Sequence, residues 1–194
     1  MNKMSWRWFL KAFSSLLAAA CIAFISLWFV LNRELGTVKK GEWKTDQTTG
    51  SARAGMYRRA RVAASGIWAL QSSEVVYYSA ETDSDGNPLR HDANYRIVGT
   101  DPDARWWSVA AYKNDHLIAN PLNRYSFSKT TVERESDGGW KIYLSPKARD
   151  KNWLPSGDGP GKLTVLLRNY NPSRQMIEAP DRVELPQLVK EPSQ

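Results

Sequence analysis

Two short segments of this chain gather side chains that could hold a polar ligand. The first, NPLNRYSF at 120–127, places two asparagines, an arginine and a tyrosine together. The second, NWLPSGDGPG at 152–161, adds an asparagine and a tryptophan in a stiff turn. Aromatic faces beside amide and guanidinium groups suit sugars or planar organic acids. With three residues from neighbouring segments, the predicted ligand-binding residues are Trp106, Trp107, Asn120, Asn123, Arg124, Tyr125, Asn152, Trp153 and Arg168.

The same residue types also have an ordinary structural use. Asparagine and arginine side chains often bond the backbone of loops, and tryptophans on strands usually belong to the core. The sequence therefore leaves two interpretations open, a ligand cleft with aromatic and polar walls or a set of residues that shape loops.

No metal or cofactor motif occurs in the chain. The two histidines, His91 and His116, are not part of an H-x-x-x-H or H-E-x-x-H pattern. The DSDGN segment at 83–87 opens like a calcium loop, but Pro88 stands where the loop needs glycine, and Asn94 where it needs glutamate. The sequence predicts no metal and no cofactor.

Catalytic residues are unknown from sequence. The GDGPGK segment at 157–162 lacks the spacing of a phosphate-binding loop and precedes a strand, so it predicts a turn. There is no G-x-S-x-G elbow to mark a nucleophilic serine. An alternative function is a membrane-tethered hydrolase, resembling a glycosidase or an esterase, whose acid and base would come from Glu81, Asp83, Asp85, His91 and His116.

The N-terminal part predicts a membrane anchor. After a tail of residues 1–11, the 21 residues 12–32 carry no charge, and Lys11 and Arg33 close the run. At about 1.5 Å per residue, such a helix covers the roughly 30 Å of a bilayer's hydrocarbon core. A cleaved signal peptide is the rival interpretation, but the apolar run is longer than usual and no A-x-A site follows it. The small residues 18–20 would also permit helix association in the membrane.

The charge of the chain is concentrated beside this segment. Residues 1–44 carry a balance of +5 and residues 45–194 only +2, of the total of +7. A nearly neutral soluble part does not suit nucleic acid, so no nucleic-acid partner is expected. Cys21, the single cysteine, lies in the apolar run, which excludes an intramolecular disulfide and a cysteine nucleophile in the soluble part.

The rest of the chain predicts a mainly β protein. Residues 33–51 are polar and rich in turn formers, which indicates a tether. The spacing of Met56, Ala60, Ala63, Ile67 and Leu70 predicts an amphipathic helix over 52–70, with its arginines on the outer face. Residues 52–189, which include this helix, are expected to form an antiparallel β-sandwich or jelly-roll-like domain, and residues 190–194 a tail. Its strands are expected at 74–82, 93–99, 105–112, 116–120, 124–129, 130–135, 140–145, 162–170 and 182–189.

Several motifs in order resemble a known bacterial family. They are EVVYYSAETDSDGNPL at 74–89, RWWSV at 105–109, NPLNRYS at 120–126, NWLP at 152–155 and RNYNP at 168–172. This order is similar to DUF1214, a domain of unknown function that often follows a DUF1254 domain. The resemblance implies a β-sandwich-like domain in the bacterial envelope, and it supplies no activity, cofactor or catalytic residue.

The expected function is a binding or structural module held at a membrane. Its expected partners are the lipid bilayer, a small polar or carbohydrate-like ligand, and an envelope protein. Lysine and arginine number three before the apolar run and four soon after it, so the positive-inside rule does not decide the orientation. A short N-terminal tail before a large domain favours a single-pass protein of the bacterial inner membrane with a periplasmic domain.

Overall fold

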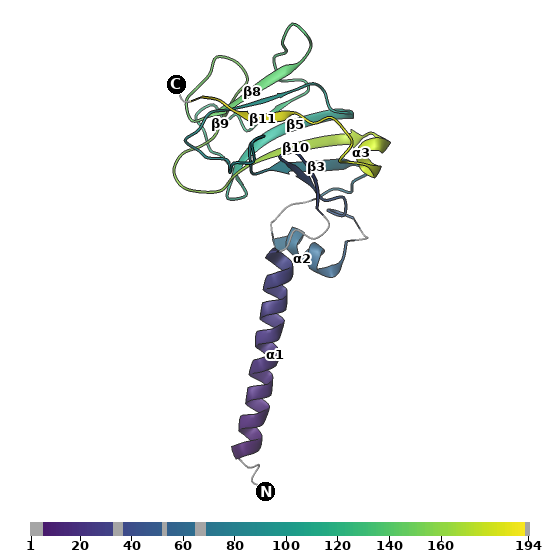
Figure 1. Cartoon of the computed structure of the whole chain (residues 1–194), viewed down its shortest axis with the longest axis vertical. Helices are drawn as coiled ribbons and strands as arrows, with labels where there is room; N and C mark the ends of the chain where they lie inside the picture. The colour runs from purple at the N-terminus through teal and green to yellow at the C-terminus, as the bar shows by residue number, and fades with distance from the viewer. Residues whose placement is uncertain (1–5, 33–36, 52–53, 65–68, 193–194) are drawn as a thin grey trace.

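The computed structural model describes residues 6–32, 37–51, 54–64 and 69–192. Its first element, α1 (Trp6–Asn32), extends away from a β domain as a single rod (Figure 1). The 24 residues Trp6–Phe29 are long and apolar enough to cross a bilayer, and none of them is buried against the protein. This helix begins at Trp6, six residues before the apolar run, so part of the expected N-terminal tail is helical as well.

Two sheets make up the β domain. The larger one has seven strands in the order β1-β2-β3-β10-β5-β6, with β7 also paired to β5. The smaller one has the order β11-β4-β8-β9, and all pairs are antiparallel except β8 with β9. The bounds are β1 Val38–Lys40, β2 Trp43–Thr45, β3 Val75–Ala80, β4 Tyr95–Gly99, β5 Ala104–Lys113, β6 His116–Leu117, β7 Ser126–Ser128, β8 Trp140–Ser145, β9 Trp153–Pro155, β10 Leu163–Pro172 and β11 Gln187–Lys190.

The core lies between the two sheets, as alternation along the strands requires. In β10, every second residue from Leu163 to Asn169 is buried, and the residues between them are partly exposed. Because side chains in a strand alternate between faces, this register turns one face of the large sheet inward. The small sheet contributes Ile97, Ile142 and Leu144 to the same core, and all three are fully buried. The predicted mainly β, antiparallel fold is confirmed.

Residues 38–45, inside the segment that the sequence indicates as a tether, extend the large sheet. They form the β1–β2 hairpin, and β2 pairs with β3. Trp43 is 1% exposed, and its indole nitrogen donates to the carbonyl of Pro186 at 2.6 Å. The hairpin therefore contributes a core side chain and a contact with the C-terminal segment.

Local structure differs from the expected strands in a few places. Residues 130–132 form a turn in place of a strand, because Thr131 and Val132 both bond back to the carbonyl of Ser128, and further on Arg134 makes an isolated bridge to Trp140. The short helix α3 (Arg174–Glu178) is capped by Ser173, whose hydroxyl accepts from the amide of Met176. Strand β9 and helix α3 are too short to give a sequence pattern.

The amphipathic helix exists, but its expected apolar side is exposed and one of its arginines, Arg58, is turned inward, while Arg59 is exposed as expected. The helix is α2 (Met56–Ala64), and the expected residues 52–53 and 65–68 lie outside the described part of the chain. Met56 is 79% exposed, and Ala60 and Ala63 are also exposed. Arg58 is half-buried, because it forms an ion pair with Asp46.

Candidate functional site

The 120–125 loop, where the sequence predicts contacts to a ligand, is exposed and bonded to itself. The side chain of Asn120 donates to the carbonyls of Ile118 and Arg124 at 3.0 and 2.9 Å. It also accepts from the amides of Leu122 and Arg124. These four bonds use all the capacity of the Asn120 amide. Its position fits a residue that shapes a loop.

The other members of this loop follow the same pattern. Asn123 has a φ of +49° and accepts from the Tyr125 hydroxyl at 3.3 Å. The Arg124 guanidinium lies over the ring of Phe127, 4.9 Å from its centre. Asn123, Arg124 and Tyr125 are exposed, and their contacts stay within the loop and β7.

Asn152 and Trp153 hold β9 in register. Asn152 is buried with a φ of +42°, and its amide accepts from the Glu133 amide at 2.8 Å. It also donates to the carbonyls of Glu133 and Lys141 at 2.7 and 2.9 Å. The indole of Trp153 donates to the Ser145 carbonyl at 3.1 Å. These bonds join Glu133, β8 and β9.

The two adjacent tryptophans of β5 lie on opposite faces of the large sheet. Trp107 is fully buried, stacks on Trp140 with 4.6 Å between ring centres, and donates to Asp101. Trp106 lies on the outer face with an edge-to-face contact to Tyr170 at 5.1 Å. Two residues before Tyr170 in β10, Arg168 bonds the Tyr112 hydroxyl and lies over its ring. Of the nine predicted residues, the structure thus brings Trp106 and Arg168 to a shared outer face of the large sheet.

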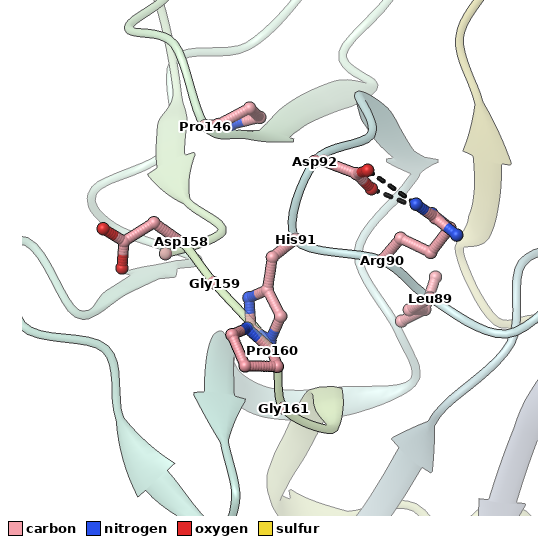
Figure 2. A pocket seen from close by; sticks show the side chains of 10 residues that line it. Leu89, Arg90, His91, Asp92, Pro146, Asp158, Gly159, Pro160 and Gly161 are labelled. Atoms are coloured by element: carbon pink, nitrogen blue, oxygen red, sulfur yellow. Dashed lines mark hydrogen bonds and ion pairs between the residues drawn. The ribbon is translucent and has the colours of Figure 1, made fainter.

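A cleft of about 600 Å³ lies elsewhere, between two loops that sequence alone does not connect. One loop precedes β4 and the other joins β9 to β10, with Pro146 after β8 closing the wall (Figure 2). Its volume is in the range of small-molecule sites. The lining residues are Leu89, Arg90, His91, Asp92, Pro146, Gly157, Asp158, Gly159, Pro160 and Gly161.

His91 is the buried polar side chain of this cleft, with 6% of its surface exposed. Its side chain extends from the 89–92 loop toward the 157–161 loop (Figure 2). Nδ1 bonds the main-chain carbonyl of Ser156. Since a carbonyl only accepts, Nδ1 carries the proton and Nε2 has a free lone pair when the ring is neutral. Within the described part of the chain, Nε2 has no hydrogen-bond partner.

Two features fix the loops around His91. The Ser156 hydroxyl, fully buried, donates back to the His91 carbonyl at 2.8 Å. Gly157 has a φ of +73°, and a Cβ there would lie 3.1 Å from Ile118 and 3.5 Å from the imidazole Nδ1. The close approach of the 157–161 loop to His91 therefore requires glycine at position 157. The expected turn at 157–162 forms, and it lines the cleft.

Charged groups stand at the rim. Arg90 binds Asp92 through two bonds, Nε to Oδ1 at 2.9 Å and Nη2 to Oδ2 at 2.6 Å (Figure 2). The hydrogen bond from Arg90 lowers the pKa of Asp92, so Asp92 is an anion at neutral pH. Asp158 is exposed, and its carbonyl accepts from Lys113 at 2.5 Å.

The carboxylates of the alternative hydrolase serve other contacts. Asp83 is 1% exposed and accepts from the amides of Asp85 and Asn87, which closes the 83–87 turn. Glu81 forms ion pairs with Lys162 and Lys44. His116 is exposed on β6. Among the described residues, no group of three or more His, Cys, Asp or Glu side chains could hold a metal.

The structure is a β-sandwich domain with a cleft between the loop before β4 and the loop that joins β9 to β10. The chain belongs to the DUF1214 family, a protein family of unknown function, whose model matches residues 74–174. Both cleft loops lie within that match. A comparison with curated proteins finds no match.

A solved structure with a similar fold supports the architecture. The VPA0106 protein from Vibrio parahaemolyticus is 25% identical, with a TM-score of 0.58. The match covers 72% of this chain but only 36% of that one, so this chain spans about a third of the relative's length. An uncharacterized protein from Burkholderia cenocepacia is 18% identical with a TM-score of 0.37, over 61% and 29% of the two chains.

Proposed function

We propose that this protein is a membrane-anchored binding module that holds a small polar ligand in the His91 cleft. The observation that carries the proposal is the Nε2 atom of His91, a buried acceptor without a partner in the described chain. Leaving such a group unsatisfied costs roughly 1–3 kcal/mol. A ligand that donates a hydrogen bond there recovers this free energy, which an apolar ligand cannot do.

The cleft favours a ligand rich in donors. Its lining residues include His91, whose buried Nε2 is an acceptor, and Asp158 with its carboxylate, while the one guanidinium, of Arg90, is engaged with Asp92. Leu89, Pro146 and Pro160 supply apolar surface. A sugar or another polyhydroxylated molecule matches this site, because its hydroxyl groups can donate to these acceptors and its carbon skeleton can contact the apolar side chains. Since Nε2 is buried, entry requires a shift of the 157–161 loop, which its three glycines permit.

The setting that we propose is the bacterial inner membrane, with α1 across the bilayer and the β domain in the periplasm. The length and apolar composition of α1 support the anchor. Residues 37–192 would then work beside the membrane surface. The alternative hydrolase has less support, because Glu81 and Asp83 are engaged in ion pairs and turn bonds away from the cleft lining.

Thermal unfolding of the full chain in detergent tests the ligand site. Glucose, N-acetylglucosamine and inositol serve as probes rich in donors, and sulfate as a probe that only accepts. His91→Asn keeps a side-chain donor near the position of Nδ1 and removes the Nε2 acceptor, and His116→Asn is the matched control at an exposed histidine. We expect at least one polyol to raise the Tm of the native chain and of His116→Asn but not of His91→Asn.

Two outcomes would contradict the proposal. One is a Tm that none of the polyols changes. The other is a polyol effect of the same size in His91→Asn as in the native chain. Release of product from nitrophenyl glycosides or esters, lost in His91→Asn, would instead support the hydrolase.

A further inference from the structure

Helix α2 carries an exposed apolar stripe. Met56 is 79% exposed and Tyr57 48% exposed, and Ala60 and Ala63 are exposed as well. Residues spaced by four and three lie on one side of a helix, so Met56, Ala60 and Ala63 form a continuous line. A soluble helix normally turns such a line toward the core.

The opposite side of α2 faces the β domain. Arg58 and Val62, four residues apart, are half-buried. The Arg58 guanidinium donates to the Thr48 hydroxyl at 2.7 Å and forms an ion pair with Asp46. Asp46 in turn accepts from the amide of Thr48 at 2.9 Å. Turning the apolar stripe inward would break this polar cluster.

The turn at residues 46–49, which carries Asp46 and Thr48, is fixed to the domain. The Gln47 side chain donates to the Ile177 carbonyl of α3 at 2.5 Å. The turn also follows β2 directly, whose Trp43 is part of the core. Helix α2 is thus held in a set orientation by the domain, with its apolar stripe pointing away from it.

Helix α2 also lies beside the C-terminal end of α1 (Figure 1). If α1 crosses a bilayer, its C-terminal end reaches the head-group region, and α2 is placed at the same level. Residues 33–44, which follow α1, hold four Lys/Arg and two Glu, a balance of +2, and α2 adds Arg58, Arg59 and Arg61, which suits anionic head groups. A short amphipathic helix with methionine and tyrosine on its free face is suited to lie in that region.

We propose that α2 is an interfacial helix that lies in the head-group region of the membrane, with Met56, Ala60 and Ala63 facing the lipid. This inference rests on the membrane anchoring proposed above. The bilayer is the occupant, and a second copy of the chain is not, because a stripe of three residues, two of them alanines, is far smaller than the roughly 800 Å² per partner of a stable dimer. The helix would fix how the domain, and its cleft, is oriented to the membrane.

Spin-label accessibility in the full chain tests this, in vesicles of phosphatidylcholine and phosphatidylglycerol at three to one. A nitroxide on native Cys21 reports on α1. In a Cys21→Ser background, labels at Ala60→Cys and Ala63→Cys report on α2, and Ser136→Cys, exposed in the turn before β8, is the matched control. We expect a severalfold higher ratio of oxygen to nickel-chelate collisions at positions 60 and 63 than at 136.

The outcomes separate the two proposals. A water-accessible label on Cys21 overturns the anchor and the interfacial helix together. An immersed Cys21 with equal ratios at 60, 63 and 136 overturns the interfacial helix alone. Spin–spin broadening at position 60 that disappears on dilution with unlabelled chain assigns the stripe to a second copy and also overturns it.

Discussion

His91 and Ser156 hold each other through two hydrogen bonds, although 65 residues separate them. The ring Nδ1 of His91 bonds the carbonyl of Ser156, and the Ser156 hydroxyl donates to the carbonyl of His91 at 2.8 Å. This pair joins the two loops that line the cleft. It also fixes the tautomer that leaves Nε2 as an acceptor.

Ser156→Ala is expected to loosen this connection. The His91 carbonyl loses its donor in a buried place, so the free energy of unfolding should fall by about 1–3 kcal/mol. Urea unfolding of the full chain in mild detergent measures the change. Ser136→Ala, at an exposed serine, is the control and should change stability by less than about 0.5 kcal/mol. Equal effects of the two substitutions would contradict the account of the pair.

Asn152 and Asn123 both have positive φ but differ in burial, so glycine at each position isolates the side-chain bonds. Glycine accepts this backbone conformation without strain. Asn152→Gly removes three bonds to Glu133 and Lys141 and should destabilise the protein by about 2–4 kcal/mol. Asn123→Gly should cost less than about 1 kcal/mol. Thermal unfolding of both variants measures the difference, and a more harmful Asn123→Gly would show that the 120–125 loop has a larger structural role than its contacts suggest.

Asp101 should make stability depend on acid pH. Burial alone would raise its pKa, but hydrogen bonds from Arg134 at 2.8 Å and Trp107 at 2.9 Å prevail and lower the pKa. A carboxyl whose pKa is lowered in the folded state stabilises the protein above its unfolded pKa of about 3.9, and this contribution is lost as the pH falls through the folded pKa. Asp101→Asn should therefore be less stable than the native chain at pH 7, and the gap should shrink toward pH 3. A gap that does not change between these pH values in urea unfolding would contradict the assignment.

Trp43 should contribute more to stability than Trp106, although only the second belongs to a predicted site. Trp43 is 1% exposed and bonded to Pro186, while Trp106 is partly exposed on the outer face of the large sheet. Trp43→Ala should cost about 3–5 kcal/mol and Trp106→Ala clearly less. Denaturant unfolding of the two variants compares them. Similar losses would mean that the β1–β2 hairpin is only loosely attached.

The sequence predicts the fold well where alternation is long. Strands such as β3, β5 and β10 carry six to ten residues of β-branched, aromatic or alternating character, and they form close to the expected places. The β1–β2 hairpin has three-residue strands among lysines and turn formers, so the pattern alone resembles a linker. The faces of α2 could not be predicted either, because Arg58 is turned inward by Asp46, a partner outside the helix.

The candidate site was beyond sequence reasoning for a related reason. The polar and aromatic composition of 120–127 and 152–161 suggests a ligand site. The side chains of Asn120 and Asn152, however, form their hydrogen bonds with backbone groups. His91 stands alone in sequence, and its partner Ser156 is visible only once β4, β8 and β9 are in place. Composition can suggest that side chains are available, but topology decides which of them meet.

The most direct test of the cleft is a nitrogen-15 spectrum of the full chain in micelles, labelled at its two histidines, during titration with inositol or with the polyol that most stabilises the protein. His116, exposed on β6, is the internal control. We predict that His91 is protonated at Nδ1 at neutral pH, and that its Nε2 resonance shifts on titration as expected for an acceptor gaining a hydrogen bond, while His116 stays constant. A His91 ring protonated at Nε2, or an Nε2 resonance that no polyol moves, would contradict the binding site proposed here.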